Sequence, residues 1–396
     1  MPQLSIQNKI LEILDYYKKQ HPKLNLPGSL FSGKIGVFLF RLAAQRHFNQ
    51  PDPNFEKELV TFVENQISKP IGLTNFCHGL SGFAWFLHYL NTEEFTDIDQ
   101  SLFEQLDEVI FNVRQEQFKE LNHDFLHGAL GDMWYFAERA KFSKKCQTYL
   151  IEYVNFLSET ATNHLKGIFW YESPIMKDEL GQNNQVVNLH ISHGQASKIA
   201  VLAKALSCGV ATAKKPLLFA ITYLLSTQES VFEKASIPHV IVNNKKEMFT
   251  HLGWCRGNLA ISIVLFNAGE VLNDLKLKQK ALEIALQTLA LNTPQKAVIK
   301  ELGFCHGTTG LAYMYNRLFE ITENSSFKNA ADYWFSITLQ LATFKNGVAG
   351  FKSYNSHSGK WEIEHGLLEG ASGAGLAMLS HLSDNKATWD ACFLLR

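Results

Sequence analysis

Two short stretches of the sequence place a cysteine beside glycines at the start of an apolar segment. They are Gly253-Trp254-Cys255-Arg256-Gly257 and Gly303-Phe304-Cys305-His306-Gly307. In both, a cysteine stands two residues before the second glycine, and in the later stretch a histidine follows it. Two thiolates and one imidazole form a zinc ligand set with one tetrahedral position open, which is typical of catalytic zinc sites. We therefore predict that Cys255, Cys305 and His306 bind one zinc ion (Zn2+).

Packing is the alternative explanation for the two cysteines. Cysteine is often a small buried residue, and ligands separated by 50 residues form a weak motif. The equivalent place of the two cysteines within a repeated pattern favours metal binding. Neighbouring inner helices lie roughly 8–10 Å apart, so thiols at equivalent positions can converge on one ion.

The repeated pattern is a Gly-x-x-Gly or Gly-x-x-small element that runs into an apolar segment and then a more amphipathic one. Its seven lead glycines are Gly33, Gly79, Gly128, Gly194, Gly257, Gly307 and Gly370, separated by 46, 49, 66, 63, 50 and 63 residues. A helix that is apolar all round is buried, whereas a one-sided helix lies at the surface. Each repeat therefore predicts one inner and one outer helix, about 14 helices in all.

We expect an all-α fold, an α/α toroid in which seven inner and seven outer helices form a double ring. An open solenoid is the alternative, but its repeats are usually regular, and these inner helices are too apolar to face solvent. We expect the glycines where inner helices crowd together. No linker divides residues 1–396, which we expect to form a single domain.

Three longer repeats carry extra residues just before the glycine element. Segments 168–188, 239–249 and 351–363 contain strand-like or turn-like pieces. We expect these short β-like loops to gather at the end of the barrel that bears the glycine elements, where function usually lies.

Chemistry-bearing side chains recur immediately before the lead glycines. The residues are Ser32, His78, His127, His193, Arg256, His306 and Glu369. Six of these seven are ionisable, which packing alone does not select. In Cys77-His78-Gly79 the pattern copies the second cysteine stretch, but we expect this copy to lie across the ring from the zinc site. With too few ligands of its own, it is interpreted as repeat heritage or packing.

Composition excludes some classes of function. The formal net charge is −1, so the chain has no basic excess for binding nucleic acid. No apolar run approaches the roughly 18 residues of a transmembrane helix. The N-terminal 20 residues are amphipathic rather than a signal peptide, so the six cysteines are expected to be reduced and the protein cytoplasmic.

The motifs resemble those of the lanthionine synthetase C (LanC) family of peptide cyclases and LanC-like proteins. The resemblance rests on Trp254-Cys255-x-Gly257, Cys305-His306-Gly307 and Ser192-His193-Gly194, and covers nearly the whole chain. It implies the toroid, zinc ligation by the two cysteines and His306, and catalytic roles for His193 and Asp124. The implied reaction adds a cysteine thiolate of a dehydrated precursor peptide to dehydroalanine or dehydrobutyrine, forming a thioether ring. The implied partners are that peptide, a separate dehydratase and an exporter.

The residues suit this reaction. Zinc lowers the pKa of a bound thiol, and the two protein thiolates keep the incoming sulfur electron-rich. Addition at the β-carbon creates an enolate, which His193 can protonate as a general acid. Asp124 would take the thiol proton or orient an imidazole. The alternatives are that His193 is a core histidine and that Asp124 is a helix N-cap.

Two positions depart from the family pattern. Many cyclases have tyrosine after the first zinc cysteine, where this chain has Arg256, and arginine four residues before it, where this chain has His251. These changes put substrate choice in doubt and favour a second hypothesis, a LanC-like protein that adds or binds another thiol such as glutathione. A third is a glycosidase using Asp124 and Glu369, and a fourth is a non-catalytic helical scaffold. Neither the third nor the fourth explains cysteines in register.

Overall fold

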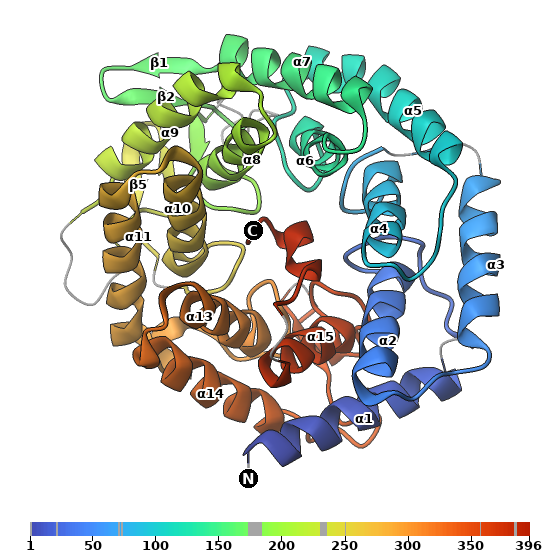
Figure 1. The fold of residues 1–396 in the computed structure, drawn as a ribbon. Coiled ribbons are helices and arrows are strands. Elements are labelled where there is room, and N and C mark those ends of the chain that lie inside the picture. The colour runs from blue at the N-terminus through green and yellow to red at the C-terminus, as the bar shows by residue number, and fades with distance from the viewer. Residues whose placement is uncertain are drawn as a thin grey trace. The chain divides into compact units, whose positions relative to one another are not determined.

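The computed structural model describes residues 2–20, 23–69, 72, 74–172, 184–229, 236–249, 251–356, 358–383 and 386–396. This part of the chain contains fifteen α-helices and seven short strands (Figure 1). The helices and strands fall into two compact units. The terminal unit comprises Met1–Gly72 and Val298–Trp389, and the central unit comprises Leu73–Ala297 and Asp390–Arg396.

The terminal unit contains the N-terminal helix and the helices of the first, sixth and seventh repeats. They are α1 (Pro2–Gln20), α2 (Lys34–Phe48), α3 (Phe55–Ile67), α13 (Thr308–Thr322), α14 (Ser325–Gln340) and α15 (Ala371–Leu382). The inner helix α15 packs against α1, α2 and α13, and α13 packs against α14. The N-terminal helix α1 buries Ile10, Ile13 and Tyr17. It thereby covers the last inner helix, after which the structure describes no further α-helix.

The central unit contains repeats two to five. Its helices are α4 (Leu80–Thr92), α5 (Gln100–Lys119), α6 (Ala129–Arg139), α7 (Lys144–Thr160), α8 (Gln195–Ser207), α9 (Lys214–Ser226), α10 (Asn258–Leu272), α11 (Leu275–Thr288) and the short α12 (Pro294–Ala297). The inner helices α4, α6, α8 and α10 pack in that order, and each packs against the helix that follows it (Figure 1). The predicted alternation of inner and outer helices is therefore present in this unit.

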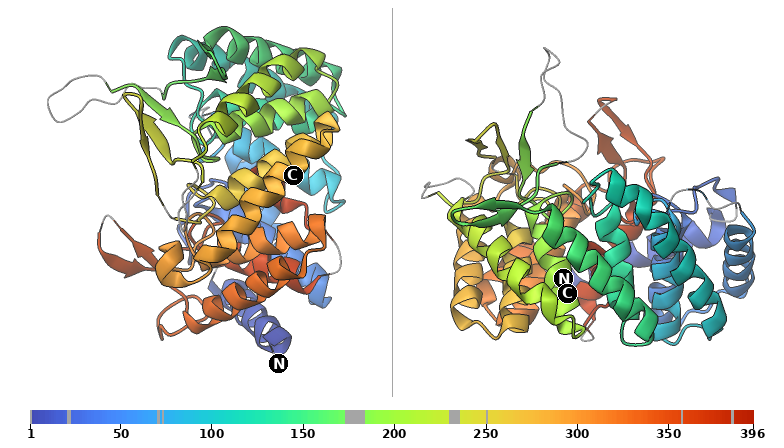
Figure 2. Two further views of the ribbon diagram at one scale, coloured as in Figure 1. Left: turned by 90° about the vertical axis from the view of Figure 1, so that its left-hand side faces the viewer. Right: turned by 90° about the horizontal axis from the view of Figure 1, so that it is seen from above.

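Short antiparallel strands occupy the longer repeats. In the central unit β1 (Thr162–His164) pairs with β2 (Gly167–Phe169), and β3 (Val186–Asn188), β4 (Val240–Val242) and β5 (Lys245–Glu247) form a sheet in that order. In the terminal unit β6 (Ser353–Asn355) pairs with β7 (Lys360–Glu362). The sheet of β3, β4 and β5 extends away from the helices of the central unit, and the pair β6 and β7 extends away from those of the terminal unit (Figure 2). Strands β2 to β7 coincide with the three predicted segments, whose residues 173–183 and His357 lie outside the described part.

Burial follows the predicted difference between inner and outer helices. In α10 every residue from Asn258 to Leu265 is buried, whereas α11 buries one stripe that includes Leu277, Ala281 and Ile284. The Asp274 side chain starts α11 by accepting the backbone N–H groups of its first turn. Among the helices of the described residues, none is both long and apolar enough to cross a membrane.

In the described repeats, the lead glycine is in every case the N-cap residue of the inner helix. The backbone at these glycines is extended, with φ between −137° and −90°, a conformation open to any residue. A Cβ added at Gly194 would lie 2.5 Å from the carbonyl oxygen of Asn188, in the turn of its own repeat. The expectation that lead glycines mark the crowding of inner helices is therefore wrong for Gly194, where the close neighbour is the preceding turn.

A second device shapes these turns. The side chain six residues before the lead glycine accepts the backbone N–H two residues further on, at 2.7 to 3.2 Å. The acceptors are Asn122, Asn188, His251 and Glu301. His251, one of the departures from the family pattern, therefore has a structural role in its turn.

We predict that Gly194→Ala destabilises the protein by about 1–3 kcal/mol, because the new Cβ meets backbone atoms that cannot move independently. Gly72→Ala is the matched control, since an added Cβ there meets nothing within 4 Å. Chemical denaturation of both variants measures the effect. Equal stability of the two variants would contradict the close-approach explanation.

Candidate active site and metal ligands

Backbone hydrogen bonds join the turns of consecutive repeats at one register position, two residues before the lead glycine. In the central unit the Cys77 N–H donates to the Leu126 carbonyl at 2.9 Å. In the terminal unit the Cys305 N–H donates to the Leu368 carbonyl at 2.9 Å, and the Leu368 N–H donates to the Phe31 carbonyl at 3.0 Å. Equivalent residues of neighbouring repeats are thus held side by side within each unit.

The next register position carries a row of imidazoles in the central unit. The His78 and His127 rings stack with centroids 5.6 Å apart, and the His127 and His193 rings stack at 6.2 Å. These are the residues immediately before three consecutive lead glycines. The sequence prediction of a rim lined by ionisable groups therefore holds across these three repeats.

Asp124 uses its two carboxylate oxygens for different partners. Its Oδ2 lies 2.5 Å from Nδ1 of His193, and its Oδ1 accepts the backbone N–H of His127 at 2.7 Å. Asn75 accepts the N–H of His78 in the same way at 2.9 Å. The alternative that Asp124 is a helix N-cap is wrong, because Gly128 is the N-cap of α6. Asp124 instead caps the turn before the helix while also pairing with His193.

The pair shifts both pKa values toward the charged forms. Burial alone would lower the pKa of His193, but the hydrogen bond and charge of Asp124 outweigh burial and raise it. Burial alone would raise the pKa of Asp124, but His193, the His127 N–H and the charge of Lys198 lower it. Each partner therefore favours the charged form of the other.

Lys198 is a member of this site that the sequence analysis missed. Its Nζ donates to the carbonyl oxygen of His193 at 3.2 Å, and burial lowers its pKa to about 8, against the charges of Asp124 and Glu172. The available signal was a lysine in the first turn of a predicted inner helix, directly before the apolar run 199–203.

Cys255 lies on the turn next to His193 within the central unit. The Ser192 hydroxyl donates to the carbonyl oxygen of Cys255 at 3.0 Å. The neighbouring Trp254 donates its indole N–H to the carbonyl oxygen of Phe393 at 2.9 Å. Cys255 is therefore a buried thiol on a turn fixed from two sides.

Cys305 and His306 lie on one turn of the terminal unit, where carboxylates flank the imidazole. The His306 Nδ1 lies 3.4 Å from Glu369 and its Nε2 lies 3.9 Å from Glu301. A histidine that binds zinc through one nitrogen usually gives its other N–H to a carboxylate or carbonyl. The donor chemistry therefore fits a zinc ligand. Because Cys255 belongs to the other unit, a single site with all three ligands stays a prediction.

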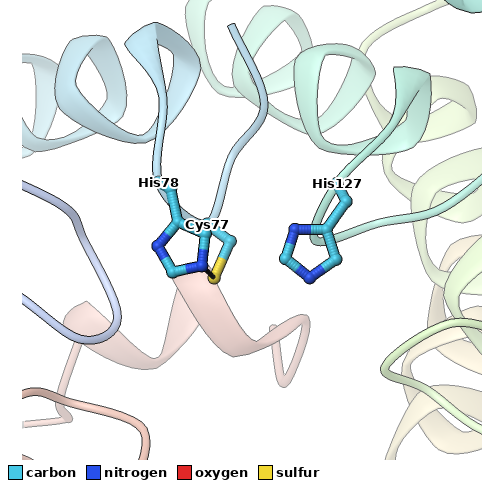
Figure 3. Close-up of side chains that lie close together, drawn as sticks. All are labelled: Cys77, His78 and His127. Atoms are coloured by element: carbon cyan, nitrogen blue, oxygen red, sulfur yellow. Dashed lines mark hydrogen bonds between the residues drawn. The ribbon is translucent and has the colours of Figure 1, made fainter. Parts of the chain in front are cut away.

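The copy at Cys77-His78 is not short of ligands. The ligand atoms of Cys77, His78 and His127 all lie within 4.8 Å of one another (Figure 3). The expectation of too few ligands overlooked the histidine supplied by the next repeat. None of the six cysteines, all within the described ranges, forms a disulfide.

Comparison with known proteins identifies the family. Residues 25–394 match the model of the family described as lanthionine synthetase C-like protein. The chain belongs to the lanthionine synthetase C-like family. The resemblance inferred from the sequence motifs is thereby confirmed.

A solved structure of nisin cyclase is similar to this LanC-like protein, with a TM-score of 0.72 and 18% sequence identity. The match covers 98% of this chain and 97% of that chain. It confirms the fold class predicted from the sequence, the all-α toroid of this family.

We predict that Asp124→Ala lowers the pKa of His193, because burial then acts without the opposing charge. NMR titration of the His193 ring measures it. The variant should also lose about 1.5–3 kcal/mol of stability, because a hydrogen bond between charged groups contributes about that much. Asp124→Asn is the matched control, because its amide oxygen can still accept the His127 N–H.

The stability deficit of Asp124→Ala should depend on pH. Because folding raises the pKa of His193, its contribution to stability is complete below the pKa of the unfolded state. That contribution is lost as the pH rises through the pKa of the folded state. Because folding lowers the pKa of Asp124, its contribution to stability is complete above the pKa of the unfolded state. That contribution is lost as the pH falls through the pKa of the folded state. The deficit should therefore be largest between about pH 4 and pH 6.5. A deficit independent of pH would contradict an ionised pair.

Proposed function

We propose that this LanC-like protein is a lanthipeptide cyclase that forms lanthionine and methyllanthionine rings in a dehydrated precursor peptide. One observation carries the proposal. Ser192, the neighbour of His193, is hydrogen-bonded to the carbonyl of Cys255. The proposed general acid and a proposed zinc ligand thus stand on adjacent turns of one unit. A separate dehydratase would supply the dehydroalanine and dehydrobutyrine.

Cys255, Cys305 and His306 would hold the zinc ion. This ligand set is supported by the equivalent positions of Cys255 and Cys305 in their repeats. Hydrogen bonds join residues two positions before the lead glycine in neighbouring repeats of each unit, and both cysteines occupy that position. When bound, zinc lowers the pKa of a coordinated thiol so that a thiolate exists at neutral pH. Glu369 and Glu301 would orient the His306 ring.

His193 would protonate the enolate that follows thiolate addition. Against burial, the hydrogen bond and charge of Asp124 raise the pKa of His193 and so favour its protonated form. Asp124 holds Nδ1, which leaves Nε2 for the substrate. The lowered pKa of Asp124 makes it a weak base. Of the two roles considered for Asp124, orienting His193 is therefore favoured over accepting the thiol proton.

Addition of a separate thiol such as glutathione is the second candidate function. It is favoured by the exposed Arg256, which stands beside Cys255 and offers a cation to a carboxylate-bearing thiol. A glycosidase is disfavoured, because both of its proposed carboxylates already pair with an imidazole, Asp124 with His193 and Glu369 with His306. Offering glutathione together with a dehydrated peptide and weighing the adduct separates the first two candidates.

We expect Cys305→Ala to lose one equivalent of zinc and ring formation together. Cys208→Ser, which changes a thiol that donates to a carbonyl within the central unit, is the control and should keep both. Elemental analysis gives the zinc content. Alkylation of free substrate cysteines followed by mass spectrometry gives ring formation, which leaves the peptide mass unchanged. Unchanged zinc content in Cys305→Ala would rule out the proposed ligand set.

His193→Gln should retain zinc and reduce kcat for cyclisation by about 10²–10⁴-fold, the usual contribution of a general acid. His47→Gln, on an inner helix of the terminal unit, is the matched control. Rates come from the loss of alkylatable thiols with time. A His193→Gln rate within a few-fold of wild type would show that another group delivers the proton.

A further inference from the structure

We propose that Cys77, His78 and His127 form a second metal site, which takes Zn2+ independently of Cys255, Cys305 and His306. The three residues of this second site come from the turns of repeats two and three, within the central unit (Figure 3). One thiolate and two imidazoles are ligands that zinc accepts readily.

The distances suit a tetrahedral ion. With Zn–S near 2.3 Å and Zn–N near 2.0 Å, tetrahedral geometry places a sulfur and a nitrogen ligand about 3.5 Å apart. The Cys77 Sγ lies 3.5 Å from Nε2 of His78. The ligand atoms of all three residues lie within 4.8 Å of one another. Because both imidazoles are exposed, small side-chain rotations can close the remaining gap.

The backbone that carries the ligands is already fixed. The Cys77 N–H donates to the carbonyl of Leu126, which ties the two turns together directly beside His127. The Asn75 and Asp124 side chains hold the N–H groups of His78 and His127. Ligands on preorganised backbone lose little entropy when an ion binds.

A carboxylate lies beside the proposed site. The Asp124 side chain accepts the backbone N–H of His127, one of the three ligands, at 2.7 Å. A single thiolate leaves a bound Zn2+ with net positive charge, which this carboxylate partly offsets. Three protein ligands leave a fourth position at the exposed side of the imidazoles, open to water or a small thiol.

The same Cys-His pair occurs at equivalent positions of two repeats. A Cys-His pair directly before a lead glycine occurs at Cys77-His78 and at Cys305-His306. In the central unit the third ligand is the His127 ring, which stacks on that of His78 at 5.6 Å. The structure therefore places the imidazole of the next repeat beside the Cys77-His78 turn.

The test uses the full chain carrying Cys255→Ala and Cys305→Ala, which removes two ligands of the first proposed site. Cobalt(II) is the probe, because thiolate coordination produces a near-ultraviolet charge-transfer band. We expect about one equivalent of Co2+ bound with that band, displaced by Zn2+. Adding Cys77→Ser should abolish the band, and adding His127→Phe should weaken binding at least about tenfold. Adding Cys208→Ser is the matched control and should change neither.

His127→Phe keeps an aromatic ring in the stack, so it decides the question if Cys77→Ser does not fold by circular dichroism. Absence of Co2+ and Zn2+ binding in the double variant, or binding that survives both added substitutions, would overturn the proposal. Because Cys255 and Cys305 are absent from this background, failure of the proposed cyclase function would not change the result. Failure of the second site would equally leave that function standing.

Discussion

The hydrogen bonds between turns of consecutive repeats are the constraint on which the candidate sites depend. They join residues two positions before a lead glycine, as between Cys77 and Leu126 or Cys305 and Leu368. Such a bond fixes how one inner helix is placed along its neighbour. Side chains at the same register position are then brought together although they are about 50 residues apart in sequence. A small number of reactive residue types, repeated in register, can therefore form a site without any local motif that contains all of them.

The turns themselves are built mostly by residues that carry no reactive group. The lead glycine allows the turn to fold back onto the start of the helix, and a side chain six residues earlier closes the turn by accepting an N–H. Asn188 and Glu301 do this in different repeats, so the acceptor can vary in chemical type. The side chains one and two positions before the glycine do not take part in closing the turn. This separation explains how one turn geometry presents cysteine, histidine, arginine or glutamate.

The sequence was sufficient to predict the repeats, the helical fold class and the starts of the inner helices. These follow from glycine spacing and hydrophobic periodicity, which are local properties. The sequence did not predict that His127 lies close to Cys77 and His78. An alignment of the repeats shows which positions correspond but not how closely their side chains approach. The sequence analysis also treated Asp124 as either a cap or a catalytic group, whereas each carboxylate oxygen has its own partner. Lys198 was missed because its altered pKa depends on burial by residues distant in sequence.

Lys198 also shows how the charges of the site depend on one another. A buried lysine is costly, and here the cost is reduced by the His193 carbonyl and by the charges of Asp124 and Glu172. Against burial, His193, the His127 N–H and the charge of Lys198 lower the pKa of Asp124, and Asp124 in turn raises the pKa of His193. Two basic side chains, His193 and Lys198, thus face two carboxylates, Asp124 and Glu172. A hydrogen-bond donor that such a network holds in place can stabilise negative charge that develops during a reaction, and an enolate is the charge that the proposed thiol addition creates.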